Sequence, residues 1–316
     1  MKTPVTRPIL LVVTPFAAEA LAPAREHFEI VEWRALPDAA VFLRERGGRV
    51  VAMITNGMAG VPANCRDTLP NLAVIACNGV GYDAIDVPWA TARGIRVSNT
   101  PDILSGDVAD LAVLLALAAH RRLPQADRFV REGQWQAGPF PLARRFWGSR
   151  VGILGLGRIG RLIARRAAAF DTQIGYCGRK PQDVPYTYFG STDALAEWAD
   201  VLIVATPGGP DTRHLVGRET LRALGGDGVL VNVARGSVVD QSALIEALGD
   251  GTLGAAGLDV FEDEPHVPPA LTGSDRVVLT PHIASATVQT RRAMAELVVE
   301  NLTRHARGLP LATPVN

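Results

Sequence analysis

The segment RVGILGLGRIGRLIARRAAAF constrains the fold more than any other part of this 316-residue chain. It places Gly155, Gly157 and Gly160 in GxGxxG spacing, after an apolar run and before an amphipathic helical pattern. In that context the first glycine permits a tight turn, the second lets the backbone approach a pyrophosphate, and the third allows close packing of helix on strand. The segment therefore predicts a βαβ unit that binds a dinucleotide at a helix N-terminus.

Short β-branched runs alternate with helical patterns over most of the chain, which is typical of parallel sheets with helices on both faces. The expected early strands are Ile9–Val13, Val50–Thr55, Ala73–Cys77 and Ile95–Ser98. The expected later strands are Arg150–Leu154, Gln173–Tyr176, Val201–Ala205, Gly228–Val233, Ala255–Asp259 and Val277–Thr280. The pattern predicts an α/β protein with two Rossmann-like or flavodoxin-like domains in series.

A boundary between the two domains is indicated at Asn99-Thr100-Pro101, where an extended segment breaks and a long helix begins near Gly106. Residues 132–148 are rich in Gly, Pro and aromatic side chains and predict an ordered arm rather than a flexible linker.

Composition bounds the partners. Lys+Arg and Asp+Glu both number 32, and no basic run of five residues occurs, which disfavours nucleic acid and anionic membranes as partners. The three cysteines form no CxxC pair, so no structural metal site is expected and a reducing compartment is favoured. The apolar run Ile9–Val13 is interrupted early by Pro15, so a buried first strand explains it better than a leader peptide. A cytoplasmic protein is expected.

The stretch YCGRK follows the second strand of the dinucleotide unit, where an acidic residue commonly accepts hydrogen bonds from the adenosine ribose. No carboxylate stands there, because Asp171 precedes the strand and Asp183 comes well after it. Arg179 and Lys180 stand there instead, and two cations without a repelling carboxylate favour NADP over NAD. The alternative is a solvated surface pair, because Arg and Lys are common at loop tips.

Three downstream segments, VNVARGSVVD, GLDVFEDEP and VVLTPHIASAT, each place a polar residue after an apolar strand. Carboxyl ends of parallel strands meet at one edge of the sheet, so Arg235, Glu264 and His282 are expected together there. An arginine can hold a 2-oxo acid by bidentate hydrogen bonds, and a histidine beside a glutamate makes a general acid whose charged form the carboxylate stabilises. Each residue alone also fits an ordinary surface or loop position.

Six motifs follow one another along the chain: NGVGYDAID, SNTPDILSGDVADLAV, GILGLGRIGR, NVARGSVVD, GLDVFEDEP and LTPHIASAT. In this order they resemble the signatures of the D-isomer-specific 2-hydroxyacid dehydrogenase family. The resemblance runs from about Val74 to the terminal TPVN. Within the family, the chain is most similar to the NADP-dependent glyoxylate and hydroxypyruvate reductases, including the plant-type hydroxyphenylpyruvate reductases. It departs from the commonest family pattern at YCGRK, and in the arm, where Trp135 is present but Gly138 stands where a second aromatic is expected.

The resemblance implies a dinucleotide-binding domain over 101–286 and a discontinuous substrate-binding domain over 1–100 and 287–316, with the active site in the interdomain cleft. The arm, with the helix from Gly106 to His120, is then expected to form a homodimer interface.

The resemblance also implies a role for each matching residue. Arg235 binds the substrate carboxylate and carbonyl oxygen, His282 donates the proton, and Glu264 holds His282 in place. Asp259 contacts the nicotinamide carboxamide. The residues expected around the cofactor are Gly155, Leu156, Gly157, Arg158, Ile159, Gly160, Gly178, Arg179, Lys180, Thr206, Pro207, Val233, Ala234 and Asp259. The residues expected around the substrate are Asn56, Gly57, Met58, Val80, Gly81, Arg235, His282 and Ser285.

The expected function is NADPH-dependent reduction of a small 2-oxo acid, glyoxylate or hydroxypyruvate, to a D-2-hydroxy acid. One alternative is an NAD-preferring D-2-hydroxyacid dehydrogenase of the D-lactate or aryl-pyruvate type, which Arg179 and Lys180 disfavour. A different class of protein, a nucleotide-sensing corepressor of the same fold, keeps the same three polar residues. The complete substrate loops favour the enzyme over that binding protein.

Overall fold

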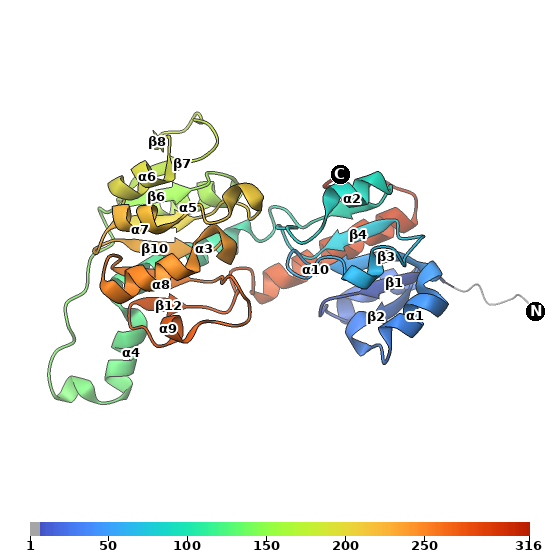
Figure 1. Ribbon diagram of the computed structural model, residues 1–316, viewed down its shortest axis with the longest axis horizontal. Coiled ribbons are helices and arrows are strands. Elements are labelled where there is room, and N and C mark those ends of the chain that lie inside the picture. The colour runs from blue at the N-terminus through green and yellow to red at the C-terminus, as the bar shows by residue number, and fades with distance from the viewer. Residues whose placement is uncertain (1–6) are drawn as a thin grey trace, which may run out of the picture. The chain divides into compact units, whose positions relative to one another are not determined.

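The chain divides into two compact units in the computed structural model, which describes residues 7–316 (Figure 1). Unit 1 comprises the chain up to Leu104 together with Thr287–Asn316, and unit 2 comprises Ser105–Ala286. The chain crosses between the units at Leu104/Ser105 and at Ala286/Thr287, whereas the sequence analysis placed its two boundaries at 100/101 and 286/287. The first six positions of the expected 1–100 segment lie outside the described residues.

Unit 1 contains a five-stranded parallel sheet in the order β2-β1-β3-β4-β5. The strands are β1 (Ile9–Val12), β2 (Glu29–Glu32), β3 (Val50–Thr55), β4 (Val74–Cys77) and β5 (Arg96–Ser98). Alternate side chains of the central strands enter different hydrophobic clusters, because successive residues of a strand point to opposite faces. Both faces of this sheet are therefore buried, as a parallel sheet requires.

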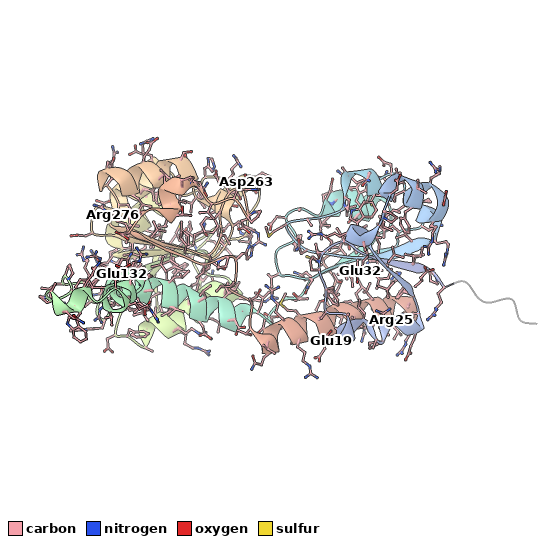
Figure 2. All side chains as sticks on the ribbon, turned by 90° about the horizontal axis from the view of Figure 1, so that it is seen from below. Glu19, Arg25, Glu32, Glu132, Asp263 and Arg276 are labelled. Atoms are coloured by element: carbon pink, nitrogen blue, oxygen red, sulfur yellow. The ribbon has the colours of Figure 1, made fainter. Side chains whose placement is uncertain are left out.

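Helices cover the two faces of the unit 1 sheet. Helices α1 (Ala39–Arg46) and α2 (Val87–Ala92) contribute Phe42, Leu43 and Ala90 to the cluster on one face. Helix α10 (Val288–Ala306) packs on the other face and brings the C-terminal segment back to unit 1. Figure 2 shows Glu19 and Arg25 beside α10, on short 3₁₀ turns that contact it.

Unit 2 contains a seven-stranded parallel sheet in the order β12-β11-β10-β9-β6-β7-β8. The strands are β6 (Arg150–Leu154), β7 (Gln173–Cys177), β8 (Thr187–Phe189), β9 (Val201–Val204), β10 (Val229–Asn232), β11 (Ala255–Leu258) and β12 (Val277–Leu279). The order reverses between β6 and β9, because β7 and β8 follow on one side of β6 and the later strands lie on the other. Open α/β sheets bind ligands at such a switch point.

The helices of unit 2 lie on both faces of its sheet (Figure 1). They are α3 (Ser105–Arg121), α5 (Arg158–Ala168), α6 (Thr192–Trp198), α7 (Arg218–Leu224), α8 (Gln241–Asp250) and α9 (Pro269–Thr272). Helix α4 (Leu123–Arg131) extends away from the sheet, contacts α3 and has no buried side chain. Helices α6, α7 and α8 share one hydrophobic cluster with alternate side chains of the sheet. Helix α3 packs against α5 and β11, and Gly257 of β11 leaves room for Leu115 of α3. The predicted α/β class with two parallel sheets is confirmed.

Two strands, β2 and β8, lie at positions where the sequence analysis placed none. Each is the edge strand of its sheet and pairs with a single neighbour. Their side chains are mostly half-buried or exposed, so neither sequence has the apolar run that marks a strand buried on both faces. Across residues 7–316, no helix is long and apolar enough to cross a membrane.

Candidate active site in unit 2

Most of the polar residues selected from the sequence lie at the carboxyl edge of the unit 2 sheet, because all seven strands run parallel. The glycine turn follows β6, the YCGRK tip follows β7, and Thr206 and Pro207 follow β9. Val233, Ala234 and Arg235 follow β10, Asp259 follows β11, and the segment with His282 and Ser285 follows β12. One sheet edge thus gathers the segments expected to bind a cofactor with those expected to do chemistry.

The glycine turn has the close contacts that its motif requires. A Cβ atom at Gly155, which has φ +98°, would lie 2.8 Å from the backbone nitrogen of Thr206. A Cβ at Gly160 would lie 2.1 Å from the carbonyl oxygen of Gly155. Both positions therefore exclude larger residues. Gly155 does so where the turn passes the segment after β9, and Gly160 does so where α5 packs on the turn that precedes it.

The N-terminus of α5 is suited to an anion. Gly157 is the N-cap residue, no side chain caps the helix, and a Cβ at this position would meet nothing within 4 Å. The first N–H groups of a helix have no acceptor within it, and the helix dipole favours negative charge there. This open, uncapped helix end fits the pyrophosphate of a dinucleotide, the group that the glycine motif predicts.

The tip after β7 presents the two expected cations. Arg179 and Lys180 are exposed, and together with Gln182 they line a cavity of about 530 Å³. Gln182 also connects this tip to the glycine turn, because its Nε2 donates to the carbonyl oxygen of Leu156 at 3.1 Å. The cations thus lie in a loop that is tied to the anion-binding turn rather than at a free loop tip.

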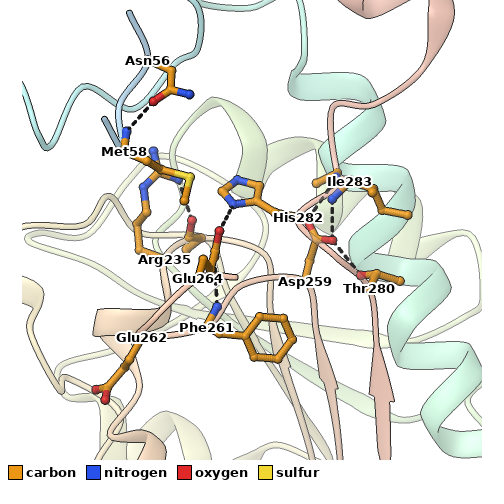
Figure 3. A network of polar contacts seen from close by, with 12 residues as sticks. Asn56, Met58, Arg235, Asp259, Phe261, Glu262, Glu264, Thr280, His282 and Ile283 are labelled. Carbon is orange, nitrogen blue, oxygen red and sulfur yellow. Dashed lines mark hydrogen bonds and ion pairs between the residues drawn. The ribbon is translucent and has the colours of Figure 1, made fainter. Parts of the chain in front are cut away.

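The structure brings the side chains of Glu264 and His282 into contact. Nδ1 of His282 lies 2.7 Å from Oε2 of Glu264, as Figure 3 shows. Oε1 of Glu264 accepts a hydrogen bond from the backbone N–H of Phe261 at 3.0 Å. The side chain of Glu264 is 13% exposed and that of His282 is 31% exposed. The carboxylate is therefore held on both oxygens, and His282 presents Nε2 as its remaining nitrogen.

Opposing effects set the pKa of Glu264. Burial acts to raise it, because a charged carboxylate loses hydration. The hydrogen bond and charge of His282 act in the other direction, with smaller contributions from the N–H of Phe261 and the charge of Arg235. The net result is a pKa below the ordinary value, so Glu264 is a carboxylate at neutral pH and stabilises a positive charge on His282.

Arg235 stands on a turn that its neighbours build. Asn232, which is 1% exposed, accepts from the N–H of Ala234 at 3.0 Å and donates from Nδ2 to the carbonyl oxygen of Arg235 at 2.9 Å. A Cβ at Gly236 would lie 1.9 Å from the carbonyl carbon of Phe261, so this glycine lets the turn approach the segment that carries Glu264. Two residues that the sequence analysis passed over thus position the arginine.

Asp259 organises the loop that carries His282. Its side chain is fully buried, and it accepts hydrogen bonds from the N–H of Ile283 (2.8 Å), the N–H of Ala284 (2.9 Å) and the hydroxyl of Thr280 (2.7 Å; Figure 3). His282 has φ +52°, a left-handed conformation that is uncommon for residues other than glycine. The buried carboxylate therefore stabilises an unfavourable backbone conformation at the proposed proton donor.

The expected substrate residues Asn56, Gly57 and Met58 lie on a loop after β3 in unit 1. Oδ1 of Asn56 accepts from the N–H of Met58 at 3.0 Å (Figure 3). A Cβ at Gly57 would lie 2.0 Å from the carbonyl oxygen of Gly81, so this loop packs on the segment with Val80. Asn99, which the sequence analysis named only at the domain boundary, donates from Nδ2 to the carbonyl oxygen of Val80 at 2.8 Å. The structure brings these two loops of unit 1 together.

Some of these supporting residues could have been found from the sequence. Gly236 follows Arg235 directly, and a glycine beside a functional residue often marks a close backbone approach. Asn232, Asn99 and Gln182 gave no comparable signal, because their roles depend on backbone groups that folding brings near. Among residues 7–316, no group of three or more His, Cys, Asp or Glu side chains is arranged to hold a metal ion.

Fold and site together define a dinucleotide-binding oxidoreductase with a histidine–glutamate pair at the carboxyl edge of its sheet. The model of the family described as D-isomer specific 2-hydroxyacid dehydrogenase, NAD binding domain, matches residues 113–284. The chain belongs to the D-isomer specific 2-hydroxyacid dehydrogenase family. A nicotinamide dinucleotide is accordingly its cofactor class.

Several reductases are similar to this chain over nearly its whole length. A glyoxylate/hydroxypyruvate reductase of Arabidopsis thaliana is 46% identical over 97% of this chain and 98% of its own length. A hydroxyphenylpyruvate reductase of Plectranthus scutellarioides is 45% identical over the same shares. Among solved structures, an NADPH-dependent glyoxylate/hydroxypyruvate reductase of Sinorhizobium meliloti, in complex with NADP and malonate, is 44% identical with a TM-score of 0.90, over 98% of this chain and 97% of that one.

Proposed function

We propose that this protein reduces a small 2-oxo acid, glyoxylate or hydroxypyruvate, to the D-2-hydroxy acid with NADPH. The proposed reduction is supported by the contact of His282 Nδ1 with Glu264 Oε2 at 2.7 Å, beside the turn that presents Arg235. The proposed use of NADPH is supported by the two cations, Arg179 and Lys180, that line the cavity beside the glycine turn. The names of the Arabidopsis and Sinorhizobium proteins support the same reaction.

The residues at the edge of the unit 2 sheet fit the cofactor. The open N-terminus of α5, at Gly157, would hold the pyrophosphate. Arg179 and Lys180 would pair with a 2'-phosphate, which NADP carries and NAD lacks. Asp259 keeps one of about four acceptor positions on its carboxylate after three hydrogen bonds. The carboxylate is fully buried, so we propose that this position takes the nicotinamide carboxamide after the loop with His282 moves aside on cofactor binding. When bound, the reduced nicotinamide supplies a hydride to the carbonyl carbon of the substrate.

The chain's own side chains bind the substrate and supply the proton. The guanidinium of Arg235 would bind the carboxylate and carbonyl oxygen of the 2-oxo acid through two of its parallel N–H groups. Nδ1 of His282 is engaged by Glu264, so Nε2 donates the proton to the carbonyl oxygen as negative charge develops there. Glu264 stabilises the protonated histidine before the transfer, and solvent restores the proton afterwards. One hydride and one proton added across C=O give the 2-hydroxy acid.

Unit 1 supplies the proposed substrate loops. Within the described residues, the N–H groups of Val80 and Gly81 donate to no protein acceptor, so both are available to a carboxylate. We propose that unit 1 is the substrate-binding domain and that the Asn56–Met58 loop and Ser285 contribute to selectivity. Apolar pocket contacts change selectivity by only about 1–3 kcal/mol each, so the acid itself is a matter for rate measurements.

A second substrate class is favoured by one finding. The Plectranthus relative is called a hydroxyphenylpyruvate reductase, and it is as similar to this chain as the Arabidopsis glyoxylate/hydroxypyruvate reductase. An aryl pyruvate has the same carboxylate and carbonyl group and differs only in its side chain. Hydroxyphenylpyruvate therefore belongs in the substrate panel beside glyoxylate and hydroxypyruvate.

The deciding experiment measures initial rates for these three acids with NADPH and with NADH, for the wild type and for Arg179→Ala/Lys180→Ala. We expect turnover with a preference for NADPH that falls in the double variant by about tenfold or more, because each lost charge-assisted hydrogen bond costs about 1.5–3 kcal/mol. Replacing Arg291 and Arg307, both exposed and in unit 1, with alanine gives a control with the same charge change. Equal use of both cofactors by the wild type would refute the NADP assignment, and no turnover with any of the three acids would refute the proposed substrates.

A second copy of this chain is the proposed partner. Large apolar side chains are exposed along α3, α4 and the arm that follows: Leu114, Leu123, Val130, Trp135, Leu142 and Trp147. Leu142 is 99% exposed, and soluble monomers seldom present several such side chains on one continuous segment. We propose that these residues form a homodimer interface, so sedimentation equilibrium should give twice the chain mass of 33.6 kDa. A monomer at micromolar concentration would contradict it.

A further inference from the structure

We propose that Gln182 is a positioning residue for cofactor selection: it fixes the cation loop, residues 178–182, at a set distance from the glycine turn. The inference rests on the proposed NADPH-dependent function and names the residue that makes the 2'-phosphate site selective. Gln182 contacts three separate elements around the cavity that it lines with Arg179 and Lys180. These contacts are with Tyr176 of β7, with Leu156 in the glycine turn and with Arg161 of α5, and each restricts the movement of the loop.

The backbone of Gln182 is anchored to the core of unit 2. Its N–H donates to the hydroxyl of Tyr176 at 2.6 Å, and Tyr176 is a fully buried residue of β7. The ring of Tyr176 lies 5.4 Å from that of Tyr188 of β8, measured between ring centroids. The hydroxyl of Tyr188 in turn donates to the carbonyl oxygen of Gly178 at 3.3 Å. Two tyrosines on neighbouring strands thus hold the two ends of the cation loop.

The side chain of Gln182 connects this loop to the anion-binding turn. Its Nε2 donates to the carbonyl oxygen of Leu156, between the first two glycines of the motif, at 3.1 Å. Its Oε1 accepts a hydrogen bond from Arg161 on α5. Both ends of the amide are engaged, so the side chain has one orientation and cannot shift toward either partner alone.

Selection of a 2'-phosphate requires such a connection. The pyrophosphate and the 2'-phosphate are attached to the same adenosine ribose, at a distance that the ribose sets. The N-terminus of α5 and the two cations must therefore be separated by that distance to bind both groups. Arg179 and Lys180 are exposed and have many rotamers, and Gly178 before them allows the backbone wide freedom. Anchoring the loop in advance reduces the ordering cost when the cofactor binds. NAD has no group for the cations to hold and gains nothing from this arrangement.

The test is equilibrium binding of NADP⁺ and of NAD⁺ by titration calorimetry, for four proteins. They are the wild type, Gln182→Met, Tyr176→Phe and the control Tyr186→Phe. Gln182→Met keeps the side-chain length and removes both amide contacts. Tyr176→Phe removes one buried hydroxyl and changes no residue that lines the cavity. Tyr186→Phe removes a hydroxyl from the same connection between β7 and β8.

We expect the Kd for NADP⁺ to rise about five- to tenfold in Gln182→Met and in Tyr176→Phe, since each loses about 1 kcal/mol of anchoring. The Kd for NAD⁺ should change less than about twofold, which also shows that the variants are folded. The control should match the wild type for both ligands. An effect in Tyr176→Phe distinguishes positioning from direct contact, because its hydroxyl is held in the core.

Two results would overturn the inference while leaving the proposed function intact. The first is an unchanged Kd for each of the two ligands in both variants, while Arg179→Ala/Lys180→Ala still lowers the preference for NADP⁺. The second is an equal loss of both ligands, which would mean that Gln182 and Tyr176 only hold the fold. If the wild type itself bound NADP⁺ and NAD⁺ equally, the cofactor assignment and the inference would fall together.

Discussion

The loop that carries His282 and the end of helix α3 both contain a buried polar side chain, and the two are satisfied to opposite degrees. Asp259 is fully buried and accepts three hydrogen bonds from its surroundings. His120 is 5% exposed, and neither of its ring nitrogens has a hydrogen-bond partner among residues 7–316. Burial of a polar side chain therefore does not by itself indicate a functional residue. Asp259, with its hydrogen bonds made, positions the proposed proton donor, whereas His120, without hydrogen-bond partners, lowers the stability of the fold.

The largest effect is expected from Asp259→Ala. The change leaves the N–H groups of Ile283 and Ala284 and the hydroxyl of Thr280 without their acceptor, at about 1–3 kcal/mol for each group that water cannot reach. We expect a loss of at least about 3 kcal/mol in the free energy of unfolding, together with the loss of turnover. Urea denaturation and initial rates measure the two quantities.

A second variant separates the two losses. His282→Ala removes the proposed proton donor and leaves the carboxylate of Asp259 and its three donors in place, so it should lower kcat by about 10²- to 10⁴-fold. Its stability should fall less than that of Asp259→Ala, because one hydrogen bond to Glu264 is lost rather than three to Asp259. Asp259→Asn keeps the shape but places an NH₂ group where a donor already points, so its stability should fall between the wild type and Asp259→Ala. If Asp259→Ala were as stable as His282→Ala, the carboxylate would not be organising the loop.

The interior strands and the polar residues that follow them could be predicted from the sequence, whereas the edge strands could not. The interior strands were predictable because each is an apolar run buried on both faces, and the polar residue after such a strand lies at the sheet edge by topology. Arg235, Glu264 and His282 were selected in this way, and the structure brings Glu264 and His282 into contact. Edge strands β2 and β8 lack that pattern because each has one neighbouring strand and is partly exposed.

The supporting contacts could not be predicted in the same way. An aspartate at a strand end gives the same sequence signal whether it faces a ligand or backbone N–H groups, and the left-handed conformation of His282 has no signal at all. Gln182 is separated by 26 positions from Leu156, whose carbonyl oxygen accepts its hydrogen bond. Such contacts are specified by how the two loops pack, and a single sequence records only the residue types.

His120 is expected to make unit 2 sensitive to acid. Burial lowers the pKa of His120 to about 4, with a further decrease from the charge of Arg144 and an opposing effect from Asp200. An unfolded histidine takes up a proton below about pH 6.5, and the folded one does so only near pH 4. The folded state must keep this histidine neutral, which costs nothing above pH 6.5 and lowers the free energy of unfolding progressively as the pH falls toward 4, by about 2 kcal/mol at pH 5.

His120→Leu removes this sensitivity, and the same substitution at the exposed His266 is the matched control. Urea denaturation at pH 5 and pH 8 should show a smaller difference in stability for His120→Leu than for the wild type, by about 2 kcal/mol. The control should keep the difference of the wild type. An unchanged difference in His120→Leu would mean that the imidazole is protonated in the folded protein at pH 5.

The smallest effect is expected from His120→Leu at pH 8, where the histidine is neutral in both the folded and the unfolded states. The ring packs edge-on against Phe146, with centroids 5.7 Å apart, and its two nitrogens lose their hydrogen bonds to water on folding without replacement. An apolar side chain avoids that loss but gives up the aromatic contact, which is worth about 0.5–1.5 kcal/mol. We expect a net gain of about 1 kcal/mol in the free energy of unfolding, opposite in sign to Asp259→Ala, while kcat stays at the wild-type value. A destabilised His120→Leu would show that the imidazole is satisfied in solution, which would remove the contrast between the two buried groups.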